Sequence, residues 1–452
     1  MNVKYIEGDT IAACATAPGE GGVALVRVSG PDAEGMMRRF FKKLPERIES
    51  HRMYYGHIVG AGAREEALCV LMRAPRSYTR EDVCEFNIHG GGETVARLLR
   101  ALYNAGVRPA EPGEFTRRAF MNGRIDLSRA EAVMSVLRAK GDAALRAGLR
   151  EMDGGIAREV GRACGELTGM LAEIGAALDF PEEIDETEIE AGLIPKIRAL
   201  SKKLNEECGR RAGDMLSRGL SAVLAGRPNV GKSSLMNALL GCERAIVTRA
   251  AGTTRDVLTE ELELSGYRVR LSDTAGQRDA DNEAERMGVE RARAALKACD
   301  IALMVLDRSE PLTGEDLELL DERDERQILI LNKADLPRAW DASDLTRRFD
   351  GRTICVSARS GEGIADLRRL MSEKAAAYAE PGAIFLHERH ISCVRRACGL
   401  MDAAAATLEA GASCELAALD LSGALSALGE ITGQTTDVDV INRIFTDFCV
   451  GK

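Results

Sequence analysis

The chain has 452 residues, of which 45% are hydrophobic and 29% are charged, a balance that is typical of a folded protein and excludes global disorder. At roughly 150 residues per domain, this length predicts two to four domains. The formal charge is 61 − 71 = −10, which excludes a cationic surface over the whole molecule. Any RNA contact is therefore expected to be a local patch or to belong to a partner.

The chain shows no feature of a membrane or secreted protein. Its apolar stretches are far shorter than the roughly 20 residues that cross a bilayer, and residues 1–10 lack a signal pattern. The 12 cysteines are spread along the chain without a C-x-x-C pair, which favours reduced thiols. We expect a cytoplasmic protein with no membrane partner.

Residues 1–120 mix short β-like runs with Gly and Pro. Strands are predicted at 23–28, 67–72 and 83–88, and a helix at 93–104. This pattern indicates a small N-terminal α+β domain.

Residues 121–216 are expected to form the first part of a helical domain. From 127 to 178 the sequence is rich in Ala, Leu, Arg and Glu, with apolar residues three or four apart and a break at Gly154-Gly155. The acidic stretch 182–190 is predicted to be a solvated loop or the start of a helix.

In residues 217–380, apolar strands alternate with helices, which predicts a parallel sheet with crossover helices. The strands are expected at 220–225, 267–271, 301–306, 327–331 and 353–356. In residues 381–452 the chain becomes helical again, with helices predicted at 391–409, 415–430 and 438–448. The predicted fold is therefore multidomain α/β, with the α+β domain, a discontinuous helical domain and an α/β domain inserted into it.

The run Gly226-Arg-Pro-Asn-Val-Gly231-Lys232-Ser233 fits G-x-x-x-x-G-K-[ST], follows an apolar strand and opens a helix. Glycines allow backbone N–H groups to face phosphates, and a helix N-terminus favours negative charge. Lys232 is expected to reach the outer phosphates, and Ser233 to ligate Mg²⁺. This is a phosphate-binding loop.

Three further motifs follow strands of the same predicted sheet. Asp273-Thr-Ala-Gly276 follows the second strand, where a carboxylate can enter the Mg²⁺ shell and a glycine N–H can sense the γ-phosphate. Asn332-Lys-Ala-Asp335 and Ser357-Ala-Arg359 follow the last two strands. All should lie at the carboxyl edge of the sheet, where such folds bind ligands.

The chemistry of these motifs selects guanine. Asp335 can accept from N1–H and the 2-amino group, Asn332 can meet the N7/O6 side, and the backbone N–H of Ala358 can donate to O6. Adenine would leave these buried groups unpaired, so we expect GTP and GDP to be the ligands.

Gly252-Thr253-Thr254-Arg255-Asp256 lies in a polar loop between the phosphate loop and Asp273. We expect this switch loop to supply Thr254 as the second Mg²⁺ ligand. The residues expected to contact GTP are Asn229, Val230, Gly231, Lys232, Ser233, Ser234, Thr248, Arg249, Ala250, Ala251, Gly252, Thr253, Thr254, Asp273, Thr274, Ala275, Gly276, Asn332, Lys333, Ala334, Asp335, Ser357, Ala358 and Arg359.

This motif set resembles the translation-factor-related GTPases. Other stretches extend the resemblance over the whole chain: Asp9-Thr-Ile-Ala, Pro18-Gly-Glu-Gly-Gly-Val, Val26-Arg27-Val-Ser-Gly30, Ser77-Tyr-Thr-Arg-Glu-Asp-Val, His89-Gly-Gly, Pro112-Gly-Glu-Phe-Thr-Arg-Arg-Ala-Phe, Asn122-Gly-Arg124-Ile-Asp-Leu and Phe448-Cys449-Val-Gly-Lys452. Together they are similar to the tRNA-modification GTPase MnmE (TrmE) family.

The resemblance implies a homodimer joined through the N-terminal domains that works with the FAD-dependent protein MnmG in a heterotetramer. That complex adds an aminomethyl or carboxymethylaminomethyl group to C5 of the wobble uridine of certain tRNAs. The resemblance implies that FAD is on the partner alone, while 5-formyl- or 5,10-methylene-tetrahydrofolate binds the N-terminal domain.

By the same resemblance, the folate-contacting positions are Arg27, Glu85, Arg124 and Lys452, where the family often has Lys in place of Arg124. Cys449 has either a thiol role or a structural place on the last turn of a helix, and we favour the structural place. For His89, a turn histidine bonded to backbone is favoured over a catalytic one.

The resemblance also implies hydrolysis stimulated by K⁺, with Asn229, Thr248, Ala250 and Thr253 as K⁺ ligands. Our further hypothesis is that GTP and K⁺ bring two GTPase domains together across the dimer. Its catalytic positions are Glu285, Lys232 and Arg255. The family usually has an apolar residue where this chain has Gln277. Gln277 either shares the orienting of the attacking water with Glu285 or points away from it, and we expect it to point away.

A ribosome-assembly GTPase that acts as an RNA-binding switch is the alternative interpretation. Such proteins share the nucleotide motifs but carry a basic appendage. The charge of −10 and the stretches at both ends of the chain count against it.

Overall fold

The computed structural model describes residues 8–60, 64–139, 141–180, 182, 186–208, 219–241, 259–264, 266–273, 294–318, 320, 324–349, 352–377, 384, 387–446 and 448–451. The chain forms two compact units. The first comprises Met1–Met134, Glu151–Glu190 and Thr407–Lys452, and the second Ser135–Arg150 and Ala191–Ala406. The predicted domain boundaries at 120, 216 and 380 stay predictions.

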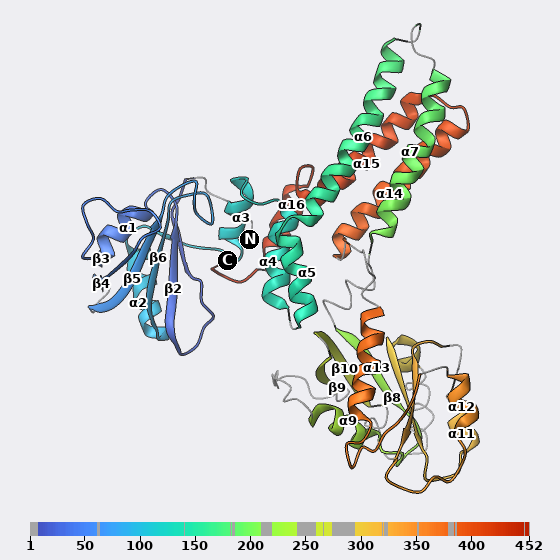
Figure 1. Ribbon diagram of the computed structural model, residues 1–452. Coiled ribbons are helices and arrows are strands. Elements are labelled where there is room, and N and C mark those ends of the chain that lie inside the picture. The colour runs from blue at the N-terminus through green and yellow to red at the C-terminus, as the bar shows by residue number, and fades with distance from the viewer. Residues whose placement is uncertain are drawn as a thin grey trace, which may run out of the picture. The chain divides into compact units, whose positions relative to one another are not determined.

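The first unit contains a seven-stranded sheet (Figure 1). Its order is β3-β4-β5-β6-β2-β1-β7, antiparallel except for the pair β1 and β7. The strands are β1 Ile11–Cys14, β2 Gly21–Ser29, β3 Phe41–Lys42, β4 Met53–Ile58, β5 Glu65–Met72, β6 Val83–Gly90 and β7 Arg108–Pro109. The helices beside it are α1 Ala33–Phe40, α2 Gly92–Asn104 and α3 Glu114–Met121.

The predictions of β2, β5, β6 and α2 are confirmed to within two residues at each end. Several elements were not predicted: β1, β3, β4, β7, α1 and α3. The strand β1 has the sequence IAAC, in which three residues are buried, so it lacks the alternation that marks a half-buried strand. Its place depends on pairing with β2 and β7.

The two faces of this sheet differ because side chains alternate along a strand. Val26 and Val28 pack into a core that also takes Phe40 of α1 and Leu102 of α2, so both helices cover one face. Arg27 points the other way, directly opposite Glu85 on β6. The register of β2 and β6 therefore brings two of the predicted folate residues together.

A buried ionic cluster fixes β1, β7 and α3. The guanidinium of Arg118, 1% exposed, bonds the carboxylates of Asp9, Glu81 and Glu114. Arg108 bonds Asp9 at 2.6 Å and also Glu114. Two arginines and three carboxylates thus compensate one another, which lets charged groups lie in the interior.

This cluster predicts acid sensitivity of the first unit. Burial alone would raise the pKa values of Asp9 and Glu114, but hydrogen bonds from Arg108 and Arg118 outweigh it and lower them. The stabilisation is therefore complete above the unfolded-state pKa of about 4 and is lost as pH falls through the folded-state values. Amide hydrogen exchange of α3, corrected for intrinsic rates, should show less protection at pH 3 than at pH 6. Equal protection would contradict this prediction, and Glu114→Gln should flatten the dependence.

The helices follow the predicted pattern. They are α4 Leu127–Arg138, α5 Asp142–Met152, α6 Gly155–Asp179, α7 Glu186–Glu206, α14 Glu388–Glu409, α15 Cys414–Thr432 and α16 Val438–Thr446. Gly154 has φ +79° immediately before α6, which explains the predicted break. Residues 186–190 of the acidic stretch are the start of α7, one of the two predicted states, and residues 183–185 lie outside the described residues. Within the first unit, α6 and α15 pack side by side and α16 packs on α3 (Figure 1).

The second unit contains a six-stranded sheet of order β13-β12-β11-β8-β10-β9. Its strands are β8 Leu220–Ala225, β9 Thr259–Leu264, β10 Tyr267–Asp273, β11 Ile301–Asp307, β12 Gln327–Asn332 and β13 Thr353–Cys355. Its helices are α9 Lys232–Gly241, α11 Gly314–Glu318, α12 Ser343–Arg348 and α13 Ile364–Ala377. The five predicted strands are confirmed and pair in parallel.

The antiparallel edge strand β9 was not predicted. Its sequence TEELEL carries three carboxylates and resembles a solvated segment. Helices α9 and α13 cover one face of the sheet and α12 the other (Figure 1). This arrangement leaves the carboxyl edge of the parallel strands to the loops that carry the nucleotide motifs.

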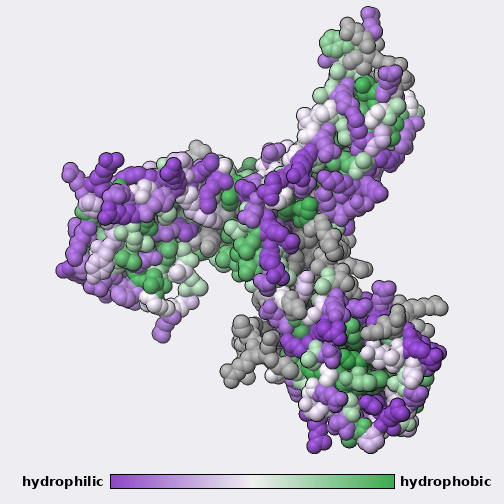
Figure 2. Space-filling view, viewed as in Figure 1, coloured by the Kyte–Doolittle hydropathy of each residue, from purple (hydrophilic) through white to green (hydrophobic). Residues whose placement is uncertain are grey.

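Within the described ranges, no helix is long and apolar enough to cross a membrane. The face in Figure 2 is largely hydrophilic, with hydrophobic residues in separate patches.

Candidate functional site

The phosphate-binding loop connects β8 to α9, and its backbone explains its glycines. Gly226 has φ +149°, and a Cβ there would lie 2.2 Å from the carbonyl oxygen of Val305. Gly231 has φ +97°, and its Cβ would lie 2.3 Å from Nδ2 of Asn332. Both positions exclude a side chain. Asn229 has φ +63°, a left-handed conformation that Asn tolerates, and is exposed.

The charged and hydroxyl groups of this loop are held in place. Nζ of Lys232 donates to the carbonyls of Gly226 at 2.8 Å and Arg227 at 2.7 Å. The hydroxyl of Ser233 donates to the carboxylate of Asp273 at 2.9 Å, although the two residues belong to different strand–loop connections. The structure thus brings together the Ser and Asp that the sequence assigned to one Mg²⁺ site.

Asn332 joins two loops of the site. Its Nδ2 donates to the carbonyl of Val230 at 2.8 Å, and its Oδ1 accepts from the N–H of Ala358 at 3.1 Å. The sequence predicted that the Asn332 side chain and the N–H of Ala358 would face guanine. In the structure, the Asn332 side chain bonds to Val230 and to Ala358 instead. Asn332 therefore fixes the phosphate-binding loop relative to the loop after β13, which carries Ser357-Ala-Arg359 and is called the base loop below.

Asp335 is the exposed carboxylate predicted to read the base. The buried hydroxyl of Ser357 donates to its Oδ1 at 2.7 Å, and this hydrogen bond lowers the pKa of Asp335. A depressed pKa keeps the group ionised, as an acceptor for two N–H groups of guanine must be. Ser357 also accepts from the N–H of Ser360, which fixes the hydroxyl.

Two carboxylates at this edge were not found from the sequence. Asp307, at the end of β11, bonds Nζ of Lys333 at 2.5 Å. Burial opposes this charge, but Lys333 and Ser309 lower the pKa of Asp307 on balance. Asp316 is 1% exposed and pairs with Arg227 of the phosphate-binding loop at 2.8 Å. The signal in the sequence that could have indicated them was position: Asp307 ends an apolar strand, and Asp316 lies between two apolar strands.

Other predicted site residues lie outside the described residues. They are Thr248, Arg249, Ala250, Ala251, Gly252, Thr253, Thr254, Arg255, Thr274, Ala275, Gly276, Gln277, Glu285 and Lys452. The roles given to them stay predictions.

Three of the four predicted folate residues meet on one face of the N-terminal sheet. Nε of Arg27 bonds Oε1 of Glu85 at 2.8 Å, and both side chains are less than one-fifth exposed. Arg124 donates to the carbonyl of Tyr78 at 3.0 Å. The guanidinium carbons of Arg27 and Arg124 lie 5.2 Å and 4.8 Å from the Tyr78 ring centroid, so one aromatic ring links the two arginines.

The C-terminal segment reaches the same region. The carbonyl of Gly451 accepts from Arg27 at 3.5 Å, and that of Cys449 from the N–H of Gly113 at 3.3 Å. The predicted place of Cys449 on the last turn of a helix is wrong, because α16 ends at Thr446 and the exposed Cys449 lies beyond it. The prediction that its thiol has no chemical role stays a prediction.

A cavity of about 810 Å³ lies beside this segment. It is lined by Cys14, by the loop between β1 and β2, by the start of α2 and by Cys449 and Val450. Its volume falls in the range of small-molecule sites. Arg27, Glu85 and Arg124 do not line it, since Arg27 and its neighbours point to the other face of the sheet.

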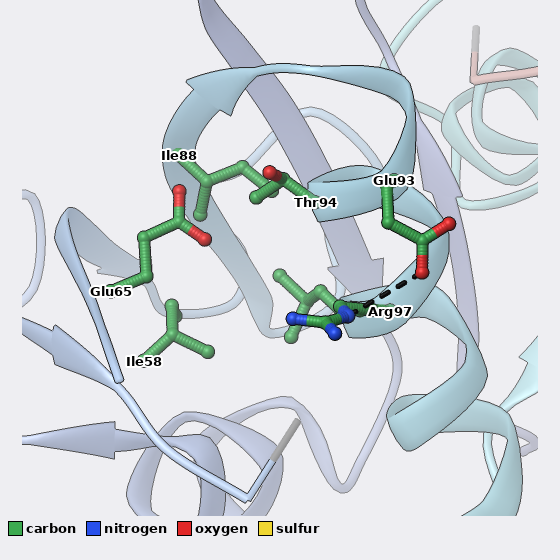
Figure 3. Close-up of a pocket in the computed structure, with 7 residues that line it drawn as sticks. Ile58, Glu65, Ile88, Glu93, Thr94 and Arg97 are labelled. Atoms are coloured by element: carbon green, nitrogen blue, oxygen red, sulfur yellow. Dashed lines mark ion pairs between the residues drawn. The ribbon is translucent and has the colours of Figure 1, made fainter. Parts of the chain in front are cut away.

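His89 does not lie in a turn, contrary to the prediction. It is on β6, largely exposed, and its Nδ1 lies 2.9 Å from Oε1 of Glu65. Glu65 also lines a second cavity, with Glu93 and Arg97 paired at 3.4 Å on its other side (Figure 3). That cavity is about 60 Å³, which suits a few water molecules and excludes a nucleotide or a folate.

Comparison with known proteins agrees with this geometry. The MnmE helical domain model matches residues 127–449, and the model of the GTP-binding protein TrmE N-terminus matches residues 10–124. The tRNA modification GTPase MnmE of Chloroflexus aurantiacus is 46% identical over 98% of this chain and 100% of its own.

The chain belongs to the MnmE family.

The MnmE of Lactiplantibacillus plantarum is 39% identical over 99% of both chains. A solved G domain of the FeoB iron transporter of T. maritima matches 35% of this chain and 98% of its own, with 27% identity and a TM-score of 0.26. The relatives named MnmE share the full length of this chain, so its N-terminal, helical and nucleotide-binding parts belong to one family arrangement.

Proposed function

We propose that this protein is the GTP-hydrolysing component of a complex that modifies the wobble uridine of certain tRNAs. With an FAD-dependent MnmG partner, it would add an aminomethyl or carboxymethylaminomethyl group to C5, using a tetrahydrofolate one-carbon unit. The observation that carries this proposal is the joint fixing of the phosphate loop and the base loop by Asn332, in a chain that matches MnmE relatives over its whole length.

In GTP hydrolysis, water attacks the γ-phosphorus, the bond to the β–γ bridging oxygen breaks, and GDP and phosphate leave. Lys232, at the start of α9, holds its ammonium against the carbonyls of Gly226 and Arg227 within the phosphate loop. Charge that develops on the phosphate oxygens is stabilised there by the ammonium and by the helix N-terminus. Asp335 orients the nucleotide by its base.

The residues present fit Mg²⁺. The hydroxyl of Ser233 and the carboxylate of Asp273 already lie within hydrogen-bond distance and are hard oxygen donors of the kind this ion prefers. They would hold the ion, with Thr254 as the predicted further ligand. The ion would neutralise phosphate charge.

Potassium is proposed as a stimulating ion, with Asn229 as the one predicted ligand among the described residues. A fixed monovalent cation near the β–γ bridge would stabilise the same charge. We propose that GTP and K⁺ pair the GTPase domains of a homodimer. Inter-domain distances measured with GDP and with a transition-state mimic, in K⁺ and in Na⁺, test this; distances that do not depend on nucleotide exclude it.

The folate proposal rests on the chemistry of Arg27, Glu85 and Arg124. A carboxylate can pair with the amino and N–H edge of a pterin, and arginines can bind carboxylates or carbonyls. The exposed Cys449 stays a candidate for a thiol role near this group.

Mass analysis of wobble uridines tests the whole proposal. Cells that lack this protein should accumulate tRNA without the C5 group, and the wild-type gene should restore it. Unchanged wobble uridines in those cells would exclude the tRNA function and would favour the alternative of a ribosome-assembly GTPase.

The C-terminal segment gives a prediction for folate binding. Gly451 has φ +93°, and a Cβ there would lie 2.2 Å from the carbonyl oxygen of Cys14. Gly451→Ala should displace the backbone at residue 451 from Cys14 and raise the dissociation constant for 5-formyl-tetrahydrofolate about tenfold, measured by calorimetry. Gly411→Ala is the matched control, since Gly411 has φ +67° with no atom within 4 Å of its Cβ. Equal affinities of Gly451→Ala and wild type would contradict the prediction.

A further inference from the structure

Tyr78 has contacts to both predicted folate arginines, although neither the sequence motifs nor the comparisons assign it a role. Its ring centroid lies 5.2 Å from the guanidinium carbon of Arg27 and 4.8 Å from that of Arg124. Its carbonyl accepts from Nη1 of Arg124 at 3.0 Å. Arg27 and Arg124 come from different elements, β2 and the turn after α3, and Tyr78 contacts both.

The loop that carries Tyr78 is itself rigidly held. The Tyr78 hydroxyl lies 2.9 Å from the hydroxyl of Thr116 on α3. The next residue, Thr79, is fully buried, with its hydroxyl 2.7 Å from that of Ser29 and its carbonyl bonded to Asn122. A side chain fixed on both sides can act as a platform without reorganising when a ligand binds.

Stacking on an aromatic ring uses the face of a guanidinium and leaves its N–H edges for other partners. Arg27 donates from Nε to the carboxylate of Glu85, and its Nη1 makes a long 3.5 Å contact to the carbonyl oxygen of Gly451. Arg124, which is exposed, donates a hydrogen bond from Nη1 to the carbonyl of Tyr78. Held in this way, Arg124 is exposed, and Arg27, whose side chain is 13% exposed, lies on the face of the sheet that carries Glu85.

We propose that Tyr78 is a positioning residue that aligns Arg27 and Arg124 for the carbonyl and carboxylate groups of a bound folate. This inference rests on the proposed folate function and deepens it. Tyr78 acts through the arginines by its ring, so the ring matters more than the hydroxyl.

The test is calorimetric titration of the full chain with 5-formyl-tetrahydrofolate. Tyr78→Leu removes the ring and should raise the dissociation constant roughly 5- to 30-fold, as expected for two cation–π contacts. Tyr78→Phe keeps the ring and should bind within about threefold of wild type. Tyr55→Leu is the control, since Tyr55 is an exposed tyrosine of the same sheet with a hydrogen bond to Glu66.

A double-mutant cycle with Arg124→Ala separates positioning from a general loss of structure. In the Tyr78→Leu background, Arg124→Ala should add much less than it does in wild type, because both changes remove one interaction. Additive effects, wild-type affinity of Tyr78→Leu, or an equal loss in Tyr78→Phe would each overturn the inference. A wild-type chain that binds no folate would overturn the folate proposal itself, and this inference with it.

Discussion

Asp335→Asn should raise the dissociation constant for GTP at least about 100-fold and create binding of xanthosine triphosphate. Asp335 is the carboxylate that accepts from the guanine edge, and each hydrogen bond to a charged group contributes about 1.5–3 kcal/mol. Asn instead presents an amide N–H₂, which suits the carbonyl that xanthine carries at C2. Fluorescence titration with both nucleotides measures the exchange of preference.

The chain offers a close control for this change. Asp341 is also an exposed carboxylate of the second unit, and a serine hydroxyl, that of Ser343 at 2.6 Å, likewise lowers its pKa. Asp341→Asn should leave GTP affinity unchanged. Ser357→Ala should weaken GTP binding by about tenfold, because Asp335 then loses the hydrogen bond that orients it. Wild-type GTP affinity of Asp335→Asn would remove the guanine assignment.

Arg118→Leu should lower the unfolding free energy of the N-terminal part by about 3–5 kcal/mol. The change leaves Glu114, 5% exposed, with one arginine fewer, and brings the carboxylates of Asp9 and Glu81 together without the cation between them. Amide hydrogen exchange of the full chain should show protection of β1 and α3 reduced by roughly 10²- to 10⁴-fold.

A surface arginine gives the control. Arg38 pairs with Glu34 at 2.7 Å but is 41% exposed, so Arg38→Ala should cost less than about 1 kcal/mol. Adding Glu114→Leu to Arg118→Leu should recover part of the loss, because one uncompensated carboxylate is removed. If Arg118→Leu and Arg38→Ala prove equally mild, the buried cluster does not stabilise this part of the protein.

The sequence alone was sufficient to predict those elements whose structure depends on residues that are neighbours along the chain. The five parallel strands alternate with helices, and their apolar runs are long enough to identify without a partner strand. The glycines of the phosphate loop follow from the positive φ angles of Gly226 and Gly231. The short strands β1 and β7 carried no such local signal, since β7 exists only by pairing with β1, and β1 by pairing with β7 and β2.

The contacts that build the sites required the tertiary structure. Ser233 and Asp273 are 40 residues apart, Asn332 and Val230 are 102 apart, and Arg118 and Asp9 are 109 apart. Sequence motifs named most of these residues as ligand contacts, yet the structure shows that Asn332 also joins two loops and that Tyr78 links two arginines. The amino-acid sequence determined which chemical groups are present and which strands they follow. Only folding decided which groups meet, because a hydrogen bond or a stacked ring depends on distances of a few ångströms that the order of residues does not contain.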